Sequence, residues 1–512
     1  MGMVSMVHSI KEVYQNMKYK TIKHQLSILT AAVMLGSSFP AVTAVTAAAE
    51  TVSSSSEAAL EDTGDTASGN SAADDSKAVS EEDSKIFKDD SDGGHAIETA
   101  GTEESYSGIT VTKTGEADGD EADFYGENAA VFATDGAQLT IEDASVTTDG
   151  THANGIFSYG NGTVVRISDS VIETSGNCSG GLMVTGGGTL EAENLTIHTS
   201  GNSSAAIRSD RGGGTETVTG GSYTTEGTGS PVIYSTADVT VSDAELTSAA
   251  SQGVVVEGKN SVTLQNVTLT ADNNTKNSDK SDTYQAVMIY QSMSGDAAEG
   301  EASFTMEDGS LTNKNGDIFF VNNTVAAITL RNAEIVNEDA GGVFLRAEAA
   351  GWGSEGSNGG HVTLTAEDQA IEGNMLVDDV SSLNLYLGSG SSFTGAVNPD
   401  AESGSVYVEL ADDTVWTLTA DSHISSLTCG EDAIDLNGYT LYVNGEVYET
   451  GTASEGEAIE VEVTASEGPG AGRPDAPPSG DGERPDMPEG NHRNPPEKPS
   501  GDLKCTRKNG HS

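Results

Sequence analysis

The chain has 512 residues, of which 61 are glycine, 35% are hydrophobic and only 5% are aromatic. So few large apolar side chains exclude a thick globular core, but they suit a thin core inside a repeated coil. Because 80 Asp and Glu residues oppose 24 Lys and Arg residues, the net charge is -56, which excludes nucleic acid as a partner.

The N-terminal region has the pattern of an export signal. Three lysines between positions 18 and 23 precede an apolar stretch at 26–45, and small residues follow up to Ala49. Gly36 and Pro40 interrupt the stretch, which is therefore short for a membrane span of about 20 residues. We predict a signal peptide at 1–49, no integral membrane span in the mature chain, and an extracellular or cell-surface location.

Two segments flank the central region and lack large apolar residues. Residues 50–104 are rich in Ser, Ala, Asp and Glu, and residues 467–512 are rich in Pro and Gly. Such segments bury too little surface to offset the loss of chain entropy on folding. The composition therefore predicts an acidic disordered spacer at 50–104 and a disordered tail at 467–512.

The central region repeats itself every 23–26 residues. Typical copies are "GAQLTIEDASVTTDG" at 136–150, "GTVVRISDSVIETSG" at 162–176 and "ADVTVSDAELTSA" at 237–249. In each copy apolar residues alternate with polar ones, which indicates short strands with one buried face. Asp-Gly, Asn-Gly and Ser-Gly pairs between the strands supply tight turns.

Strands this short cannot form separate sheets, but they can stack coil on coil. The repeat therefore predicts an all-β fold, a right-handed parallel β-helix of about ten to eleven coils at 105–404, with insertions near 271–285, 294–301 and 349–360. A β-propeller or a leucine-rich repeat would need a different period or a fixed asparagine. The predicted inward ladder contains apolar residues: Ile141, Ile167, Val241, Leu264, Met306 and Leu330.

This pattern resembles the parallel β-helix proteins of the pectate-lyase-like superfamily and the adhesin-like bacterial surface proteins built in the same way. The resemblance implies contact with polysaccharides on an exposed parallel sheet. Residues 405–466 depart from the repeat and carry bulkier side chains, including Trp416, Tyr439 and Tyr442. We interpret this segment as closing coils that form a C-terminal cap, rather than as a platform for stacking sugars.

No catalytic residues can be assigned from the motifs. The polygalacturonase signatures Asn-Thr-Asp, Gly-His-Gly and Arg-Ile-Lys have no good match, and the carboxylates of Asp378 and Asp379 are neighbours that point to opposite faces of a strand. Lyase chemistry requires a basic residue beside the substrate. The candidate substrate-binding residues are Arg166, which alternation directs outward, and Arg208 and Arg211, which precede a glycine-rich turn.

No cofactor and no metal site is predicted, because the histidines are scattered and no calcium-binding motif is present, although the acidic surface leaves room for loosely bound Ca²⁺. We expect a non-enzymatic, adhesin-like protein that presents a polar acidic surface to glycans or to a surface protein. The alternative is a β-helix lyase or hydrolase acting on polysaccharides, or a glycan-binding module. One of the three arginines within about 6 Å of two carboxylates in a cleft would favour that alternative.

Overall fold

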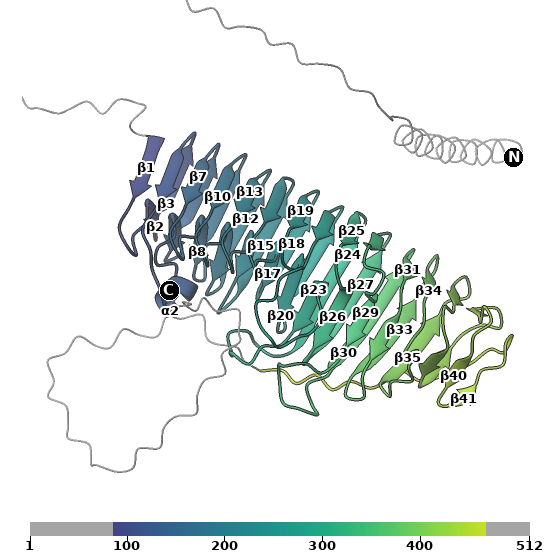
Figure 1. Ribbon diagram of the computed structural model, residues 1–512. Helices are drawn as coiled ribbons and strands as arrows, with labels where there is room; N and C mark the ends of the chain where they lie inside the picture. Colours follow the sequence, from purple (N-terminus) through teal and green to yellow (C-terminus); the bar gives the residue numbers. More distant parts are fainter. Residues whose placement is uncertain (1–84, 467–512) are drawn as a thin grey trace, which may run out of the picture. The chain divides into compact units, whose positions relative to one another are not determined.

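The computed structural model describes residues 85–466, which are all-β and consist mainly of long sheets of parallel strands (Figure 1). The predicted signal peptide at 1–49, the first part of the predicted spacer at 50–84 and the predicted tail at 467–512 lie outside the described residues. Within residues 85–466, no helix has the length and apolar character needed to cross a membrane.

Three large sheets contain most of the strands, and every third strand in the sequence joins the same sheet. Sheet A has ten strands: β1 (Ile86–Asp89), β4 (Thr110–Lys113), β7 (Ser145–Thr148), β10 (Val171–Thr174), β13 (Thr196–Thr199), β16 (Ser222–Thr225), β19 (Glu245–Ser248), β22 (Thr268–Ala271), β25 (Ser310–Asn313) and β28 (Glu334–Asn337). Except for β1, which comes first, each strand of sheet A follows a strand of sheet C in the chain.

Sheet B has eleven strands: β2 (Ile97–Ala100), β5 (Val131–Thr134), β8 (Ile156–Tyr159), β11 (Leu182–Thr185), β14 (Ile207–Ser209), β17 (Ile233–Ser235), β20 (Val254–Glu257), β23 (Gln285–Tyr290), β26 (Asp317–Asn322), β29 (Leu345–Ala347) and β32 (Met375–Val377). Sheet C has thirteen strands: β3 (Glu103–Ser107), β6 (Gln138–Glu142), β9 (Val164–Ser168), β12 (Gly188–Glu193), β15 (Gly214–Thr219), β18 (Asp238–Ser242), β21 (Ser261–Gln265), β24 (Glu301–Glu307), β27 (Thr324–Arg331), β30 (Gly360–Glu367), β33 (Ser382–Leu387), β35 (Ser405–Leu410) and β38 (Ser426–Thr428).

A left-handed residue separates the strand of sheet C from the strand of sheet A in repeat after repeat. Asp143, Asp169 and Asn194 have φ angles of 54°, 48° and 55° at this point. Asp, Asn and Gly adopt this conformation at the lowest cost, so the chain turns here without breaking the repeat. The Asn194 side chain also donates a hydrogen bond of 2.6 Å to Asp169 in the preceding repeat.

The inner faces of the sheets enclose one continuous apolar core. Ile141 pairs with Ile167, and further along the same ladder Val241, Leu264, Met306 and Leu330 pair in succession. All six side chains are buried, so the predicted inward ladder is confirmed. Parallel strands lie about 4.8 Å apart, which brings each of these side chains into contact with its neighbours in the ladder.

Residues 370–447 depart from the three-sheet pattern. Two small sheets appear here, namely β31 (Ala370–Glu372), β34 (Ser392–Thr394), β36 (Val415–Thr417) and β39 (Ile434–Asp435), and β37 (Ser422–Ile424), β40 (Leu441–Val443) and β41 (Glu446–Val447). The last pair, β40 and β41, is antiparallel. Trp416 is fully buried, stacks on Phe393 at 5.4 Å and donates a hydrogen bond to the Gly395 carbonyl, so this ring has a structural role.

The last described residues run back over sheet C. The Gly456 amide hydrogen-bonds to Thr428, Ile459 exchanges two hydrogen bonds with Asn384, and Ser466 hydrogen-bonds to Glu299. Figure 1 shows this segment as the yellow strand-free trace that passes below the sheets. It ties the C-terminal part of the described region to the middle of the repeats.

The predicted boundary of the acidic spacer was wrong. Strands β1 and β2 and the start of β3 lie inside the range 50–104 that the composition assigned to a disordered segment. The reason is that a terminal repeat needs few apolar residues, because only one of its sides faces a neighbouring repeat. Phe87 packs edge-on against Tyr106 at 5.3 Å, and Ile97 is buried in the core, which is sufficient to order these short strands.

Candidate binding cleft on the outer face of sheet B

The outer face of sheet B carries a column of side chains that are almost all buried. Alternation along each strand directs these side chains away from the core, and the strand register aligns them from repeat to repeat. In order, the column contains Phe132, Phe157, Met183, Arg208, Tyr234, Val255, Met288, Phe320 and Arg346. Arg208 therefore lies between two apolar groups of residues.

Segments outside the three sheets cover this column. The short helix α2 (Asp120–Phe124) hydrogen-bonds to sheet B through the Phe124 carbonyl and Thr185. Three inserted segments, at 272–284, 291–300 and 348–359, interrupt the regular repeat beside the same sheet. They form the walls of a cleft with three adjoining hollows. The first hollow shares Tyr290 with the second and Gly229 with the third, and the second and third share Tyr234.

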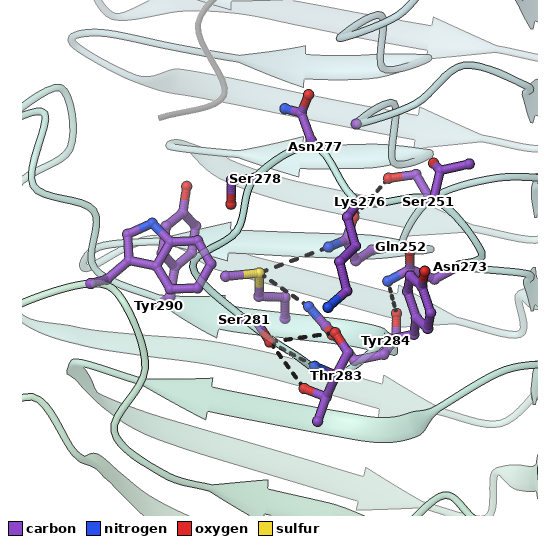
Figure 2. Close-up of a pocket in the computed structure, with 15 residues that line it drawn as sticks. Ser251, Gln252, Asn273, Lys276, Asn277, Ser278, Ser281, Thr283, Tyr284 and Tyr290 are labelled. Atoms are coloured by element: carbon purple, nitrogen blue, oxygen red, sulfur yellow. Dashed lines mark hydrogen bonds between the residues drawn. The ribbon is translucent and has the colours of Figure 1, made fainter. Parts of the chain in front are cut away.

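The first hollow is lined by aromatic, amide and hydroxyl side chains around Lys276 (Figure 2). It contains about 570 Å³ of empty space, including its open mouth. The Tyr290 and Trp352 rings meet edge to face at 5.2 Å, and the Lys276 ammonium lies 5.7 Å from the centre of the Tyr284 ring. Such a mixture of flat apolar surfaces and hydrogen-bonding groups is typical of sites for small polar molecules.

The second hollow is smaller and contains charged residues that are almost completely buried. Arg208 and Glu257 are 6% and 2% exposed. The Nη2 atom of Arg208 lies 3.1 Å from Asp210, whereas its Nη1 atom is buried without a hydrogen-bond partner. The hydroxyl groups of Tyr234 and Tyr290 both donate to Oε2 of Glu257, the second at 3.0 Å.

Two carboxyl groups in this hollow have shifted pKa values. Burial raises the pKa of Asp210 to about 6, and the charge of Arg208 opposes the shift. Burial also raises the pKa of Glu257 to about 7; the charge of Asp210 acts in the same direction, while neighbouring hydroxyl groups act against it. Burial raises the pKa of Tyr234 as well, with the charge of Glu257 adding to the effect. Such shifts in a cleft are a frequent property of functional sites.

Arg211 joins two walls of the second hollow. Its guanidinium lies 2.7 Å from Asp296 of the 291–300 segment and 3.6 Å from Asp120 of α2. It also stacks 3.8 Å from the centre of the Phe124 ring. The hydrogen bond and charge of Asp296 hold the pKa of Arg211 above its usual value against the effect of burial. Asp123 on the same helix contacts His152 at 2.8 Å.

The structure separates the three arginines that the sequence singled out. Arg208 lines the cleft, whereas Arg211 lies at its rim, where it contacts the lining residue Asp296 and has two carboxylates within about 6 Å. Arg166 lies on the outer face of sheet C, half exposed, where it pairs with Glu191 at 2.9 Å. It therefore points outward, as alternation predicts, but it does not belong to the cleft.

Sequence reasoning missed most of the other cleft residues, notably Tyr234, Glu257, Tyr290, Asp296 and Trp352. One signal was available for the first three, since each occupies an outward position of a sheet B strand in the predicted alternation. The other two lie on insertions, whose direction the repeat does not specify. Within residues 85–466, no group of three or more His, Cys, Asp or Glu side chains has an arrangement that could hold a metal ion.

Comparisons with known proteins add no identity to this geometry. No protein-family model, no curated protein and no solved structure matches the chain.

Proposed function

We propose that the chain is an extracellular or cell-surface, adhesin-like protein built as a right-handed parallel β-helix, and that it binds glycans in the cleft on sheet B. The helical form is supported by the return of every third strand to the same parallel sheet, since crossovers between parallel strands are almost always right-handed. The location is supported by the export-signal pattern before Ala49. N-terminal sequencing of the protein recovered outside producing cells tests that location.

The observation that carries the proposal is the aromatic and amide lining of the first hollow. Sugar rings bind to proteins by stacking their apolar faces on aromatic rings while their hydroxyl groups exchange hydrogen bonds with polar side chains. Tyr284 offers a partly exposed ring and the edge of the mostly buried Trp352 ring completes the apolar lining, while Gln252, Asn273 and Lys276 offer hydrogen-bonding groups in the same hollow. Figure 2 shows Gln252, Asn273 and Lys276 close to one another and to Tyr284.

A glycan array tests the proposal directly. The wild-type protein is expected to bind a defined set of glycans, and Trp352→Ala is expected to weaken that binding by about tenfold or more, because it removes part of the apolar wall of the hollow. Tyr439→Ala is the matched control, since Tyr439 is 42% exposed and lies near the end of the described region. Thermal unfolding of Trp352→Ala shows whether the fold is kept. An array on which the wild-type protein binds no glycan contradicts the proposal.

A second candidate function, glycan hydrolysis, is favoured by one specific observation. Asp210 and Glu257 are carboxyl groups with raised pKa values in one cleft, and general acid–base cleavage uses such a pair. Asp210 directly follows β14 and Glu257 ends β20, and β17 lies between these two strands, so their backbones are about 10 Å apart. Release of reducing ends from any glycan bound on the array, with loss of this activity in Glu257→Gln, would support hydrolysis. Binding without cleavage leaves the protein a glycan-binding module.

A further inference from the structure

The second hollow contains more negative than positive groups. Asp123, Asp210, Glu257 and Asp296 line it, whereas Arg208 is its one cationic lining residue among those described. The available cations are already paired: Arg208 with Asp210, and Arg211 at the rim with Asp296. Glu257 interacts with the hydroxyl groups of Tyr234, Tyr290 and Ser292 but forms no ion pair with a described residue. Burial of a carboxylate without a cationic partner is costly.

Two atoms in this hollow lack hydrogen-bond partners, and they have opposite polarity. The Oε1 atom of Glu257 is an acceptor without a donor, and the Nη1 atom of Arg208 is a donor without an acceptor. Both residues are more than nine-tenths buried and both line the hollow. Buried polar atoms are normally satisfied, so this pair indicates a ligand that offers both a donor and an acceptor.

A protonated amino group is the donor that best suits Glu257. An ammonium group forms charge-assisted hydrogen bonds with a carboxylate, and these are stronger than those of a neutral hydroxyl group. The hydroxyl groups of Tyr234 and Tyr290 both donate to Oε2 of the same carboxylate, which leaves Oε1 for the ammonium. An anionic group in this position would instead face the repulsion of Asp210 and Glu257. The charge of the hollow therefore favours a cation.

We propose that the second hollow is a subsite for the protonated amino group of an amino sugar, with the ammonium on Glu257 and a neighbouring hydroxyl oxygen on Arg208. This inference rests on the proposed glycan binding and names the class of glycan. An amino sugar carries both an amino group and hydroxyl groups, so one ligand offers the donor and the acceptor that the two unpartnered atoms lack. The ammonium of a lysine side chain offers donors but no adjacent acceptor, so a basic peptide fits less well.

The proposal also separates the subsite from the hydrolytic alternative. Binding of an ammonium requires the ionised form of Glu257, whereas a general acid must carry a proton. The same side chain thus has opposite requirements in the two cases. A ligand that keeps Glu257 ionised would leave Asp210, the carboxyl group with the lower pKa of the two, as the one proton donor of the pair.

Three tetrasaccharides that differ at one position test the subsite. Tetramers of glucose, of N-acetylglucosamine and of glucosamine share the same β-1,4 linkage, and only the last carries a free amino group. Binding to the full chain is measured by calorimetry. The glucosamine tetramer is expected to bind about tenfold tighter than the other two, and Glu257→Gln is expected to remove this preference. Glu191→Gln changes the charge equally on the exposed face of sheet C and is expected to keep it.

Each remaining outcome decides against the subsite. Equal affinity for the three tetramers, or a preference for glucosamine that survives Glu257→Gln, would overturn the inference, the second by showing that general acidity of the protein is responsible. Binding of a lysine-rich peptide through Glu257, without binding of the glucosamine tetramer, would also overturn it in favour of a basic peptide. The array on neutral glycans separates these failures from failure of glycan binding itself, because it does not depend on an amino group.

Discussion

The outer faces of sheets B and C have the same backbone geometry but opposite environments. On sheet C the central outward column contains threonines that are exposed or half-buried: Thr217, Thr240, Thr263, Thr305, Thr329 and Thr365. On sheet B the corresponding column contains Met183, Arg208, Tyr234, Val255, Met288 and Phe320, and all but Tyr234 are buried. Strand alternation fixes the direction of a side chain, whereas the segments that cover a face decide its chemistry.

The difference follows from where the repeat tolerates insertions. Helix α2 and the segments 272–284, 291–300 and 348–359 all lie beside sheet B, and Ala350 and Trp352 of the last segment pack on its outer apolar side chains. When a segment covers the outer face of a strand, an outward-pointing side chain can be apolar, and a polar side chain in the same position loses its contact with water. The cleft is a consequence of this cover, since Arg208 and Glu257 would be ordinary surface residues on an open sheet.

Among substitutions on the outer faces of the two sheets, the largest change in the free energy of unfolding is expected on sheet B. Phe320→Ala on the outer face of sheet B removes a fully buried ring from the cluster with Met288 and Trp352, and should lower the free energy of unfolding by about 3–5 kcal/mol. Thr329→Ala, at an outward position of sheet C in the same repeat, should change it by at most about 0.5 kcal/mol. Urea unfolding of both variants measures the difference. Similar losses in the two variants would show that the cover over sheet B does not pack tightly.

A smaller effect is expected at Glu216, a carboxyl group on the inner face of sheet C. It is fully buried between Leu190 and Val239 of the neighbouring strands, and both of its carboxylate oxygens lack hydrogen-bond partners. Burial raises the pKa of Glu216 well above its usual value of 4.5. Glu216→Leu should therefore raise the free energy of unfolding, by about 1–3 kcal/mol for the unsatisfied group alone.

The pH dependence of this gain has a definite sign. A carboxyl group whose pKa is raised in the folded state contributes to stability through its bound proton. This contribution is fully present below the pKa of the unfolded state and is lost as the pH rises through the pKa of the folded state. The stability gain of Glu216→Leu over the wild type should therefore increase as the pH rises above about 4.5. Unfolding measured at several pH values for both proteins checks this, with Glu216→Gln as the isosteric control. A gain that shrinks with rising pH would show that the folded protein holds Glu216 ionised.

The sequence predicts the inner faces well and the covered outer face poorly. Ile141, Ile167 and Val241 could be placed in the core because strict alternation and a regular period leave one register in which every repeat is buried. The insertions were visible in the sequence as breaks in the repeat period. Such a break shows how long the inserted segment is, but it does not show which sheet the segment covers. For that reason the contact of Arg211 with Asp296, 85 residues further along the chain, could not be foreseen.

The smallest effect is expected at Arg166, which tests whether exposed side chains on the outer face of sheet C contribute to the stability of the protein. Arg166 and Glu191 are adjacent in the outward column of sheet C, with side chains 46% and 48% exposed. Water and salt screen such a pair, and ordering two long side chains offsets part of the attraction. A double-mutant cycle with Arg166→Ala and Glu191→Ala should therefore give a coupling energy of about 0.2–1 kcal/mol at low salt and close to zero at about 1 M salt. Glycan binding by Arg166→Ala should equal that of the wild type. A large coupling energy that persists in salt, or a loss of glycan binding, would show that sheet C has a cover or a ligand of its own, and the contrast between the two faces would then no longer hold.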